Sequence, residues 1–166
     1  MAYEPETASI RLPALLWART VFQLRRRSAG RRESGAFLLG RQRGPAAQVT
    51  TFVCYDDLDA KAYQNGAIAF HAPGYAKLWE FCRRMGLQVL ADVHTHPGAS
   101  IYQSSIDQKN PMVPMTGHTA LILPHFGRTA WWSLKGVGVY EYLGNFRWRT
   151  HDAAALGSTR INLTLW

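Results

Sequence analysis

An apolar run that leads into two alternating histidines constrains this chain more than any other feature. Residues 87–93 are mostly apolar and continue directly into His94, Thr95, His96 and Pro97. Such a run is typical of a buried strand, in which alternate side chains point to the same face. His94 and His96 therefore share a face. Pro97 ends the strand, because its nitrogen has no hydrogen to donate to the ladder.

A serine and an aspartate follow the histidines in what we expect to be a loop that returns over the two rings. Two imidazoles and one carboxylate are a usual ligand set for catalytic zinc, with the fourth position left to water. Zinc lowers the pKa of that water and polarises a neighbouring carbonyl. We therefore predict that His94, His96 and Asp107 bind one Zn²⁺, and that Ser104 donates a hydrogen bond to a developing oxyanion.

Hydrolysis at such a site also needs a general base. Glu33 is our candidate, because it opens an apolar run that we predict to be a strand beside the histidine strand. The small residues after it would let the two backbones approach closely. Taken singly, a buried histidine is most often a hydrogen-bonded core residue, and a glutamate at a strand start is often only solvated. Together, at this spacing, the residues favour a metal site.

The pattern resembles the JAMM or MPN+ family of metalloproteases, also called JAB domains. Their motif is an upstream glutamate, then His-x-His-Pro, six residues, and Ser-x-x-Asp, and each position is filled here at that spacing. Glu33 is followed by Gly35, Leu38 and Gly40, which is similar to the compact bacterial branch of the family. The resemblance assigns the same roles to the same residues: zinc ligands His94, His96 and Asp107, general base Glu33 and oxyanion donor Ser104.

The resemblance implies an MPN-like fold and a hydrolase that cleaves after the C-terminal glycine of a ubiquitin-like protein. The bond would be an isopeptide bond to a target or a peptide bond in a precursor. The expected partners are the ubiquitin-like protein or its conjugate, and the E1-like and E2-like enzymes of the same bacterial, antiviral conjugation system. A related branch processes sulfur-carrier proteins of the same fold, and the sequence does not separate these activities.

A different class shares the His-x-His-Pro motif, namely the non-enzymatic, DNA-associated relatives that are RadC-like. The formal net charge of +8 favours this alternative. The presence of Glu33 beside a complete ligand set argues against it, since a binding module needs no base. We therefore do not expect nucleic acid as the partner.

The length of 166 residues, with 47% hydrophobic side chains, fits one domain with a substantial core. We expect a flexible N-terminus over residues 1–10 and the JAB/MPN metalloprotease domain over residues 11–166. Cys54 and Cys82 lie in apolar segments without a metal-binding spacing, so we expect free, buried thiols. No secretory leader or membrane span is evident, so we predict a cytoplasmic protein without membrane contact.

The hydrophobic pattern predicts the α/β class, with a mixed, mostly antiparallel sheet packed by helices. Helices are expected over residues 13–27 and 73–85, the second capped by Gly86. Asp56, Asp57 and Asp59 lack the pattern of a calcium loop, and we expect a simple loop there. The predicted strands are residues 33–41, 48–55, 66–71, 87–93, 118–123, 131–134, 137–143, 147–149 and 161–166.

Much of the positive charge lies early in the chain, and two interpretations of it stay open. Arginines concentrated on one segment suit an acidic partner. They also suit a solvated helix face, whose C-terminal turn attracts cations. The arginines concerned are Arg19, Arg25, Arg26, Arg27, Arg31, Arg32, Arg41 and Arg43.

Overall fold

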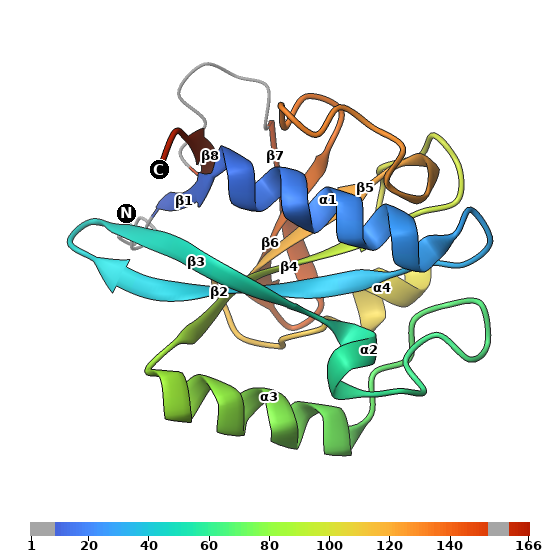
Figure 1. Cartoon of the computed structure of the whole chain (residues 1–166), viewed down its shortest axis with the longest axis horizontal. Coiled ribbons are helices and arrows are strands. Elements are labelled where there is room, and N and C mark those ends of the chain that lie inside the picture. Colours follow the sequence, from blue (N-terminus) through green and yellow to red (C-terminus); the bar gives the residue numbers. More distant parts are fainter. Residues whose placement is uncertain (1–8, 153–159) are drawn as a thin grey trace.

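A computed structural model of the chain describes residues 9–152 and 160–166. It forms one α/β domain around an eight-stranded sheet, in the order β7-β6-β5-β4-β2-β3-β1-β8 (Figure 1). The strands are β1 (Ser9–Pro13), β2 (Gly35–Arg43), β3 (Ala46–Cys54), β4 (Gln88–Thr95), β5 (Thr119–Leu123), β6 (Gly138–Gly144), β7 (Arg147–His151) and β8 (Ile161–Thr164). The helices are α1 (Ala14–Ser28), α2 (Tyr55–Leu58), α3 (Ala72–Met85) and α4 (Ser105–Lys109), with a 3₁₀ turn η1 (His125–Gly127).

The sheet is mixed, with antiparallel pairs in the majority. Strands β2–β3, β2–β4, β5–β6 and β6–β7 pair antiparallel, whereas β4–β5, β1–β3 and β1–β8 pair parallel. The predicted mixed sheet with covering helices is confirmed at this level. Strand β4 lies in its interior, between β2 and β5.

Two layers of apolar side chains cover the two faces of the sheet. Helix α1 buries Trp17 in a cluster with Leu38, and α3 buries Leu78 in a second cluster with Phe37. Phe37 and Leu38 are neighbours in β2. Because successive side chains of a strand point to opposite faces, the two residues pack in different layers. Figure 1 shows α1 and α3 on opposite sides of the central strands. No helix of residues 9–152 and 160–166 is long and apolar enough to cross a membrane.

The second predicted helix is confirmed, and its end depends on a glycine. Gly86 follows α3 with φ of 63°, a left-handed conformation that suits glycine, and its N–H donates to the Arg83 carbonyl. Two apolar side chains of α3, Trp79 and Met85, are nevertheless 44% and 48% exposed. The core contact of α3 is a narrower stripe than the apolar residue types suggest.

The N-terminal boundary needs a correction. Residues 9 and 10, which we expected in a flexible segment, begin β1, and Ile10 is buried. The strand pairs with β3 on one side and β8 on the other. The strand is too short for a recognisable alternation of apolar and polar residues. It is stabilised by pairing with strands that are distant in sequence. The rest of the predicted flexible segment, residues 1–8, lies outside the described residues.

Two predicted strands are wrong. Residues 66–71 and 131–134 do not join the sheet, although both contain apolar or aromatic side chains. In the second segment only Leu134 is buried, while Trp131 and Trp132 are exposed. Local residue type favours a strand in both segments, but neither segment pairs with a strand of the sheet.

Gly40 provides a test of the packing between β2 and β3. A Cβ atom at this position would lie 1.9 Å from the Gln48 carbonyl oxygen, beside an irregularity in the β2–β3 register. Gly40→Ala should therefore lower the free energy of unfolding by about 2 kcal/mol or more, because backbone must move. Urea denaturation measures this change.

The matched control is Gly98→Ala, where an added Cβ meets no atom within 4 Å. It should change the free energy of unfolding by less than about 0.5 kcal/mol. Equal stabilities for the two variants would contradict the close approach at Gly40.

Candidate metal site

Strand β4 positions the two histidines. His94 lies between Gly35 of β2 and Ile122 of β5, and the His96 N–H donates to the Leu123 carbonyl at 2.8 Å. Both backbones are thus held by neighbouring strands. The predicted shared face is confirmed, because the two Nε2 atoms lie 3.1 Å apart.

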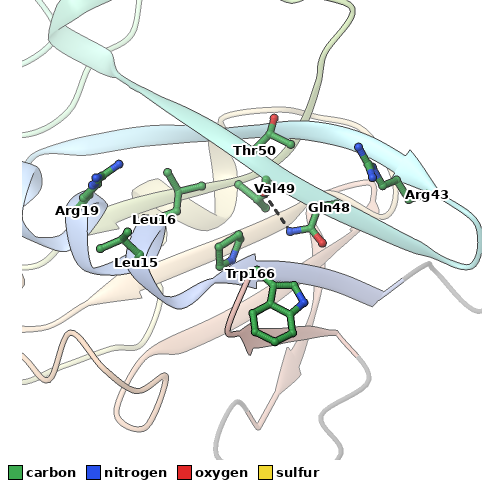
Figure 2. A pocket seen from close by; sticks show the side chains of 9 residues that line it. Leu15, Leu16, Arg19, Arg43, Gln48, Val49, Thr50 and Trp166 are labelled. Carbon is green, nitrogen blue, oxygen red and sulfur yellow. Dashed lines mark hydrogen bonds between the residues drawn. The ribbon is translucent and has the colours of Figure 1, made fainter.

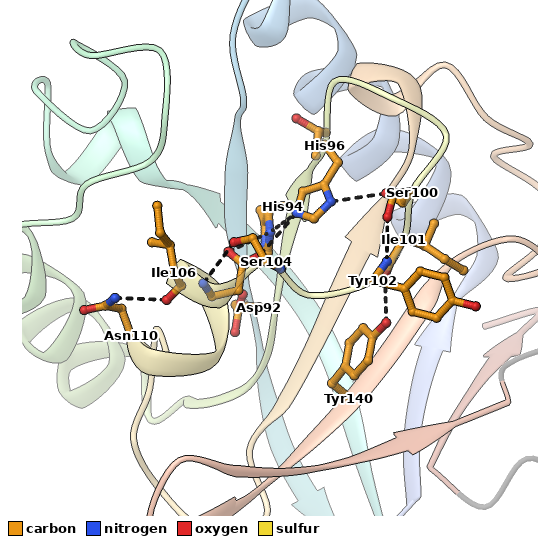
Figure 3. A network of polar contacts seen from close by, with 12 residues as sticks. Asp92, His94, His96, Ser100, Ile101, Tyr102, Ser104, Ile106, Asn110 and Tyr140 are labelled. Carbon is orange, nitrogen blue, oxygen red and sulfur yellow. Dashed lines mark hydrogen bonds and ion pairs between the residues drawn. The ribbon is translucent and has the colours of Figure 1, made fainter.

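The loop after Pro97 and the short helix α4 bring in the aspartate (Figure 3). Ser104 caps α4: its hydroxyl oxygen accepts from the Asp107 N–H, and its own N–H donates to the Asp107 carboxylate at 2.7 Å. Strands at one side of the sheet anchor the ends of this segment. Tyr140 donates to the Ile101 carbonyl at 2.7 Å, and Trp148 donates to the Gln108 carbonyl at 3.1 Å.

The spacing of the ligand atoms fits a zinc ion. The Asp107 carboxylate oxygens lie 3.4 Å from His94 Nε2 and 3.3 Å from His96 Nε2. Two ligands about 2.0–2.2 Å from a tetrahedral zinc lie about 3.3–3.5 Å from each other. These contacts and the 3.1 Å separation of the imidazoles are close to that value. Two imidazoles and a carboxylate are also the donor types that zinc accepts.

The protonation of the three groups is strongly coupled. Burial lowers the pKa of His94, and the carboxylates of Asp107 and Asp92 oppose that shift. The hydrogen bond to Asp107 raises the pKa of His96, against the effect of burial. Burial acts to raise the pKa of Asp107, but hydrogen bonds with His96 and Ser104 and the charge of His94 hold it well below its usual range. Asp107 is therefore a carboxylate, as a metal ligand must be.

One histidine has a partner for its second ring nitrogen. His96 Nδ1 lies 3.2 Å from the Ser100 carbonyl oxygen. A carbonyl only accepts, so Nδ1 carries the hydrogen in this contact. When Nε2 gives up the hydrogen that it donates to Asp107, the neutral ring presents the Nε2 lone pair, which is the tautomer that a metal ligand requires.

Glu33 lies at the same end of the sheet, just before β2. Its N–H donates to the Gly66 carbonyl at 3.3 Å, and its carboxylate accepts from the Ile68 N–H. Burial raises the pKa of Glu33; the His96 charge opposes this shift and the Asp107 charge adds to it. Glu33 precedes Gly35, which pairs with His94, so it lies within electrostatic reach of the ligand group. A carboxylate with a raised pKa is better suited to accept a proton than an exposed one.

Buried hydroxyls fix Glu33 relative to the histidines. The Ser34 N–H donates to Thr95 Oγ1 at 3.0 Å, and Thr95 N–H donates to the Ser34 carbonyl at 2.9 Å. The Ser28 hydroxyl at the end of α1 lies 3.1 Å from Thr95 Oγ1. Glu33 and the residue between the two histidines are therefore joined to one rigid network.

The structure brings together His94, His96 and Asp107, places Ser104 in contact with Asp107, and sets Glu33 close by. Their roles in binding and catalysis stay predictions. The sequence interpretation missed the supporting residues: the Ser100 carbonyl and the Thr95 hydroxyl. A carbonyl has no signature in a sequence, but Thr95 lies between the histidines and points to the other face, where a polar side chain needs a buried partner.

A second group with metal-binding atoms has a different explanation. Cys54, Asp56 and Asp57 also lie close together. Arg27 contacts the carboxylates of Asp56 and Asp57 at 2.6 and 3.1 Å. Burial raises the pKa of the Cys54 thiol to about 12, so it keeps its proton. The group is an ion-paired link between α1 and α2, and Cys54 and Cys82 are free and buried as predicted.

A groove elsewhere on the molecule shares no residue with the ligand group. Its volume is about 490 Å³, and it lies between the start of α1, strand β3 and Trp166 (Figure 2). Leu15, Leu16 and Val49 line it, with Arg19 and Arg43 nearby. The residues that line it include no histidine, cysteine or carboxylate.

No family model matches this chain. Its fold is similar to the solution structure of protein DSY2949 from Desulfitobacterium hafniense, with a TM-score of 0.59 and 15% identity over 93% of this chain and 92% of that one. It is also similar to the solution structure of a protein from Salinibacter ruber, with a TM-score of 0.56 and 14% identity over 88% and 90% of the two chains. At these identities the likeness concerns the fold alone.

Removal of one imidazole tests the ligand group. His96→Ala should lose bound zinc, because two remaining ligands hold the ion too weakly to survive dialysis. Elemental analysis of the dialysed protein measures the loss. His71→Ala serves as the control, since His71 is paired with Asp59 and is not part of the group. Retention of a full equivalent of zinc by His96→Ala would remove His96 from the ligand set.

Proposed function

We propose that this chain is a zinc-dependent peptidase or isopeptidase of the JAMM/MPN+ type. The observation that supports this most is the convergence of the ligand atoms of His94, His96 and Asp107, with the Glu33 carboxylate beside them. A binding module needs neither an acid–base group nor a three-ligand site with room for a fourth ligand. The interior position of β4 in a mixed sheet between helices also agrees with the MPN-like fold that we propose.

Zinc held by these residues would supply a Lewis acid that activates water and polarises a carbonyl. Glu33 takes the proton from the attacking water and passes it to the leaving amine. Ser104 turns its hydroxyl hydrogen towards the developing oxyanion, while its oxygen still caps α4. The reaction is therefore amide hydrolysis without a covalent intermediate.

The substrate that we propose is a ubiquitin-like protein with a C-terminal glycine, either conjugated to a target or carrying an extension. An extended tail of this kind can lie beside a strand near the ligand group. The connections at residues 56–65 and 108–117 are short, so we expect little selectivity among linkages. Maturation of a precursor, deconjugation in an antiviral system and processing of a sulfur carrier are the three physiological forms that this activity can take.

A DNA-associated function of the RadC-like kind is the second candidate. The observation that favours it is the unpaired basic charge at the end of the sheet that carries the histidines. Arg25, Arg26 and Arg31 are exposed and have no carboxylate partner within residues 9–152 and 160–166. The hydrolase remains our first proposal, because the binding of duplex DNA does not require a general base such as Glu33.

Glu33→Ala separates metal binding from catalysis. The variant should keep zinc and lose cleavage of a C-terminally extended ubiquitin-like protein by about a hundredfold or more, as expected for removal of a general base. Gel analysis of the cleavage and elemental analysis of zinc measure the two properties. Glu80→Ala on the exposed face of α3 is the control and should cleave normally. Near-normal turnover by Glu33→Ala would assign the base to another residue.

The arginines at the end of α1 lie at the end of β4 that carries the histidines, on the opposite face of the sheet, because Ser28 contacts Thr95. Arg25→Glu/Arg26→Glu should weaken the binding of an acidic peptide about tenfold at low salt, as expected for two exposed contacts of about 0.7 kcal/mol each. Fluorescence anisotropy with a labelled Glu-rich peptide measures this affinity.

The matched control is Arg83→Glu/Arg84→Glu, which reverses two charges in the last turn of α3. This turn precedes β4, so it lies about 20 Å from the histidines at the other end of the strand. Equal affinities for the two double variants would leave Arg25 and Arg26 as a solvated helix end. Tight binding of duplex DNA, lost only in Arg25→Glu/Arg26→Glu, would favour the DNA-associated function.

A further inference from the structure

A buried carboxylate lies below the candidate metal site and has no part in the proposed mechanism. Asp92 precedes His94 by two residues in β4, so its side chain is on the same face of the sheet. Its side chain is almost fully buried, as is that of its partner His118. Figure 3 shows Asp92 next to the ligand group.

Two hydrogen bonds hold this carboxylate. His118 Nε2 lies 2.6 Å from Asp92 Oδ1, and the Tyr55 hydroxyl donates to Asp92 Oδ2 at 3.1 Å. Each oxygen thus has its own partner, and the partners come from α2 and from the residue before β5. The orientation of the Asp92 carboxyl group is therefore fixed at both oxygens.

The packing continues from this network to the first histidine. The Tyr55 ring lies against Gly35, where a Cβ atom would come within 2.2 Å of the ring. Gly35 is the residue paired with His94 in the β2–β4 register. A glycine is thus required where the network meets the ligand strand, and any side chain there would displace the tyrosine.

A buried charge of this kind is not needed for stability. Well-packed apolar side chains of similar volume are often as stabilising as a buried ion pair, because desolvation of the charge is costly. A negative charge near His94 can instead contribute to the binding of a metal ion. It attracts a divalent cation, and the interaction is strong because little water screens it.

We propose that Asp92 is a positioning residue that increases the zinc affinity of the site. It acts through its negative charge behind His94. His118 and Tyr55 each hold one oxygen of Asp92, so one contact remains when the other is removed. This role rests on the proposed function insofar as the ion is zinc. The electrostatic interaction between Asp92 and His94 agrees with it, since Asp92 favours positive charge at that position.

The test is the dissociation constant for zinc, measured by competition with a chromogenic chelator and without any substrate. Asp92→Asn should bind zinc about tenfold or more weakly than the wild type, as expected for loss of a group that supports a metal ligand. Tyr55→Phe is the matched control, because it removes a hydrogen bond of the same network and keeps the charge. It should destabilise the protein and leave the zinc affinity within about twofold.

The melting temperatures of the metal-free proteins separate the proposed role from a structural one. A lower melting temperature of Asp92→Asn with an unchanged dissociation constant would overturn the proposal and leave Asp92 as a packing residue. If Asp92→Asn does not fold, Asp92→Ser also removes the charge, and its dissociation constant for zinc is judged in the same way. Failure of the wild type to bind zinc would instead overturn the proposed function, so the two failures are distinct.

Discussion

The antiparallel pairing of β2 with β4 is the constraint on which the site depends. It joins Gly35 to His94, and this register sets Glu33 beside the residues that follow the strand. A shift by one residue would turn every side chain of β4 to the other face. The histidines would then face α1, and Thr95 would lose its buried hydroxyl partners. The apolar residues of β4 that pack under α1 oppose such a shift, so the core and the site specify the same register.

The rest of the domain holds the three ligand side chains in place, although their partial burial costs free energy. Two imidazoles and a carboxylate that are partly withdrawn from water cost free energy unless they are hydrogen-bonded or bound to an ion. Tyr140 and Trp148 hold the loop and α4 over the histidines from strands β6 and β7. Helix α1 supports the opposite face through Ser28. Strands β2 and β4 are in turn stabilised by the apolar layers, and the polar contacts hold α4 on them, so the ligand atoms are preorganised for an ion.

Much of the site was predictable because it depends on local rules. Alternation in a strand places His94 and His96 on one face, and the spacing from Ser104 to Asp107 encodes a helix cap. The same rules fail where long-range pairing decides. Strand β1 forms because β3 and β8 flank it, and residues 131–134 form no strand because they pair with no strand of the sheet. For Asp92, alternation in the strand predicts the face of the sheet on which its side chain lies. Its partners Tyr55 and His118 are distant in sequence, so local rules do not predict them.

The most direct test of the metal site is the anomalous diffraction of zinc-soaked crystals at the zinc absorption edge. We predict one strong peak between His94 Nε2, His96 Nε2 and the Asp107 carboxylate. The chain contains another group with suitable atoms, Cys54 with Asp56 and Asp57, whose carboxylates Arg27 neutralises. A peak at that second group, or no ordered peak beside the histidines, would contradict the central claim that β4 and α4 form a metal site.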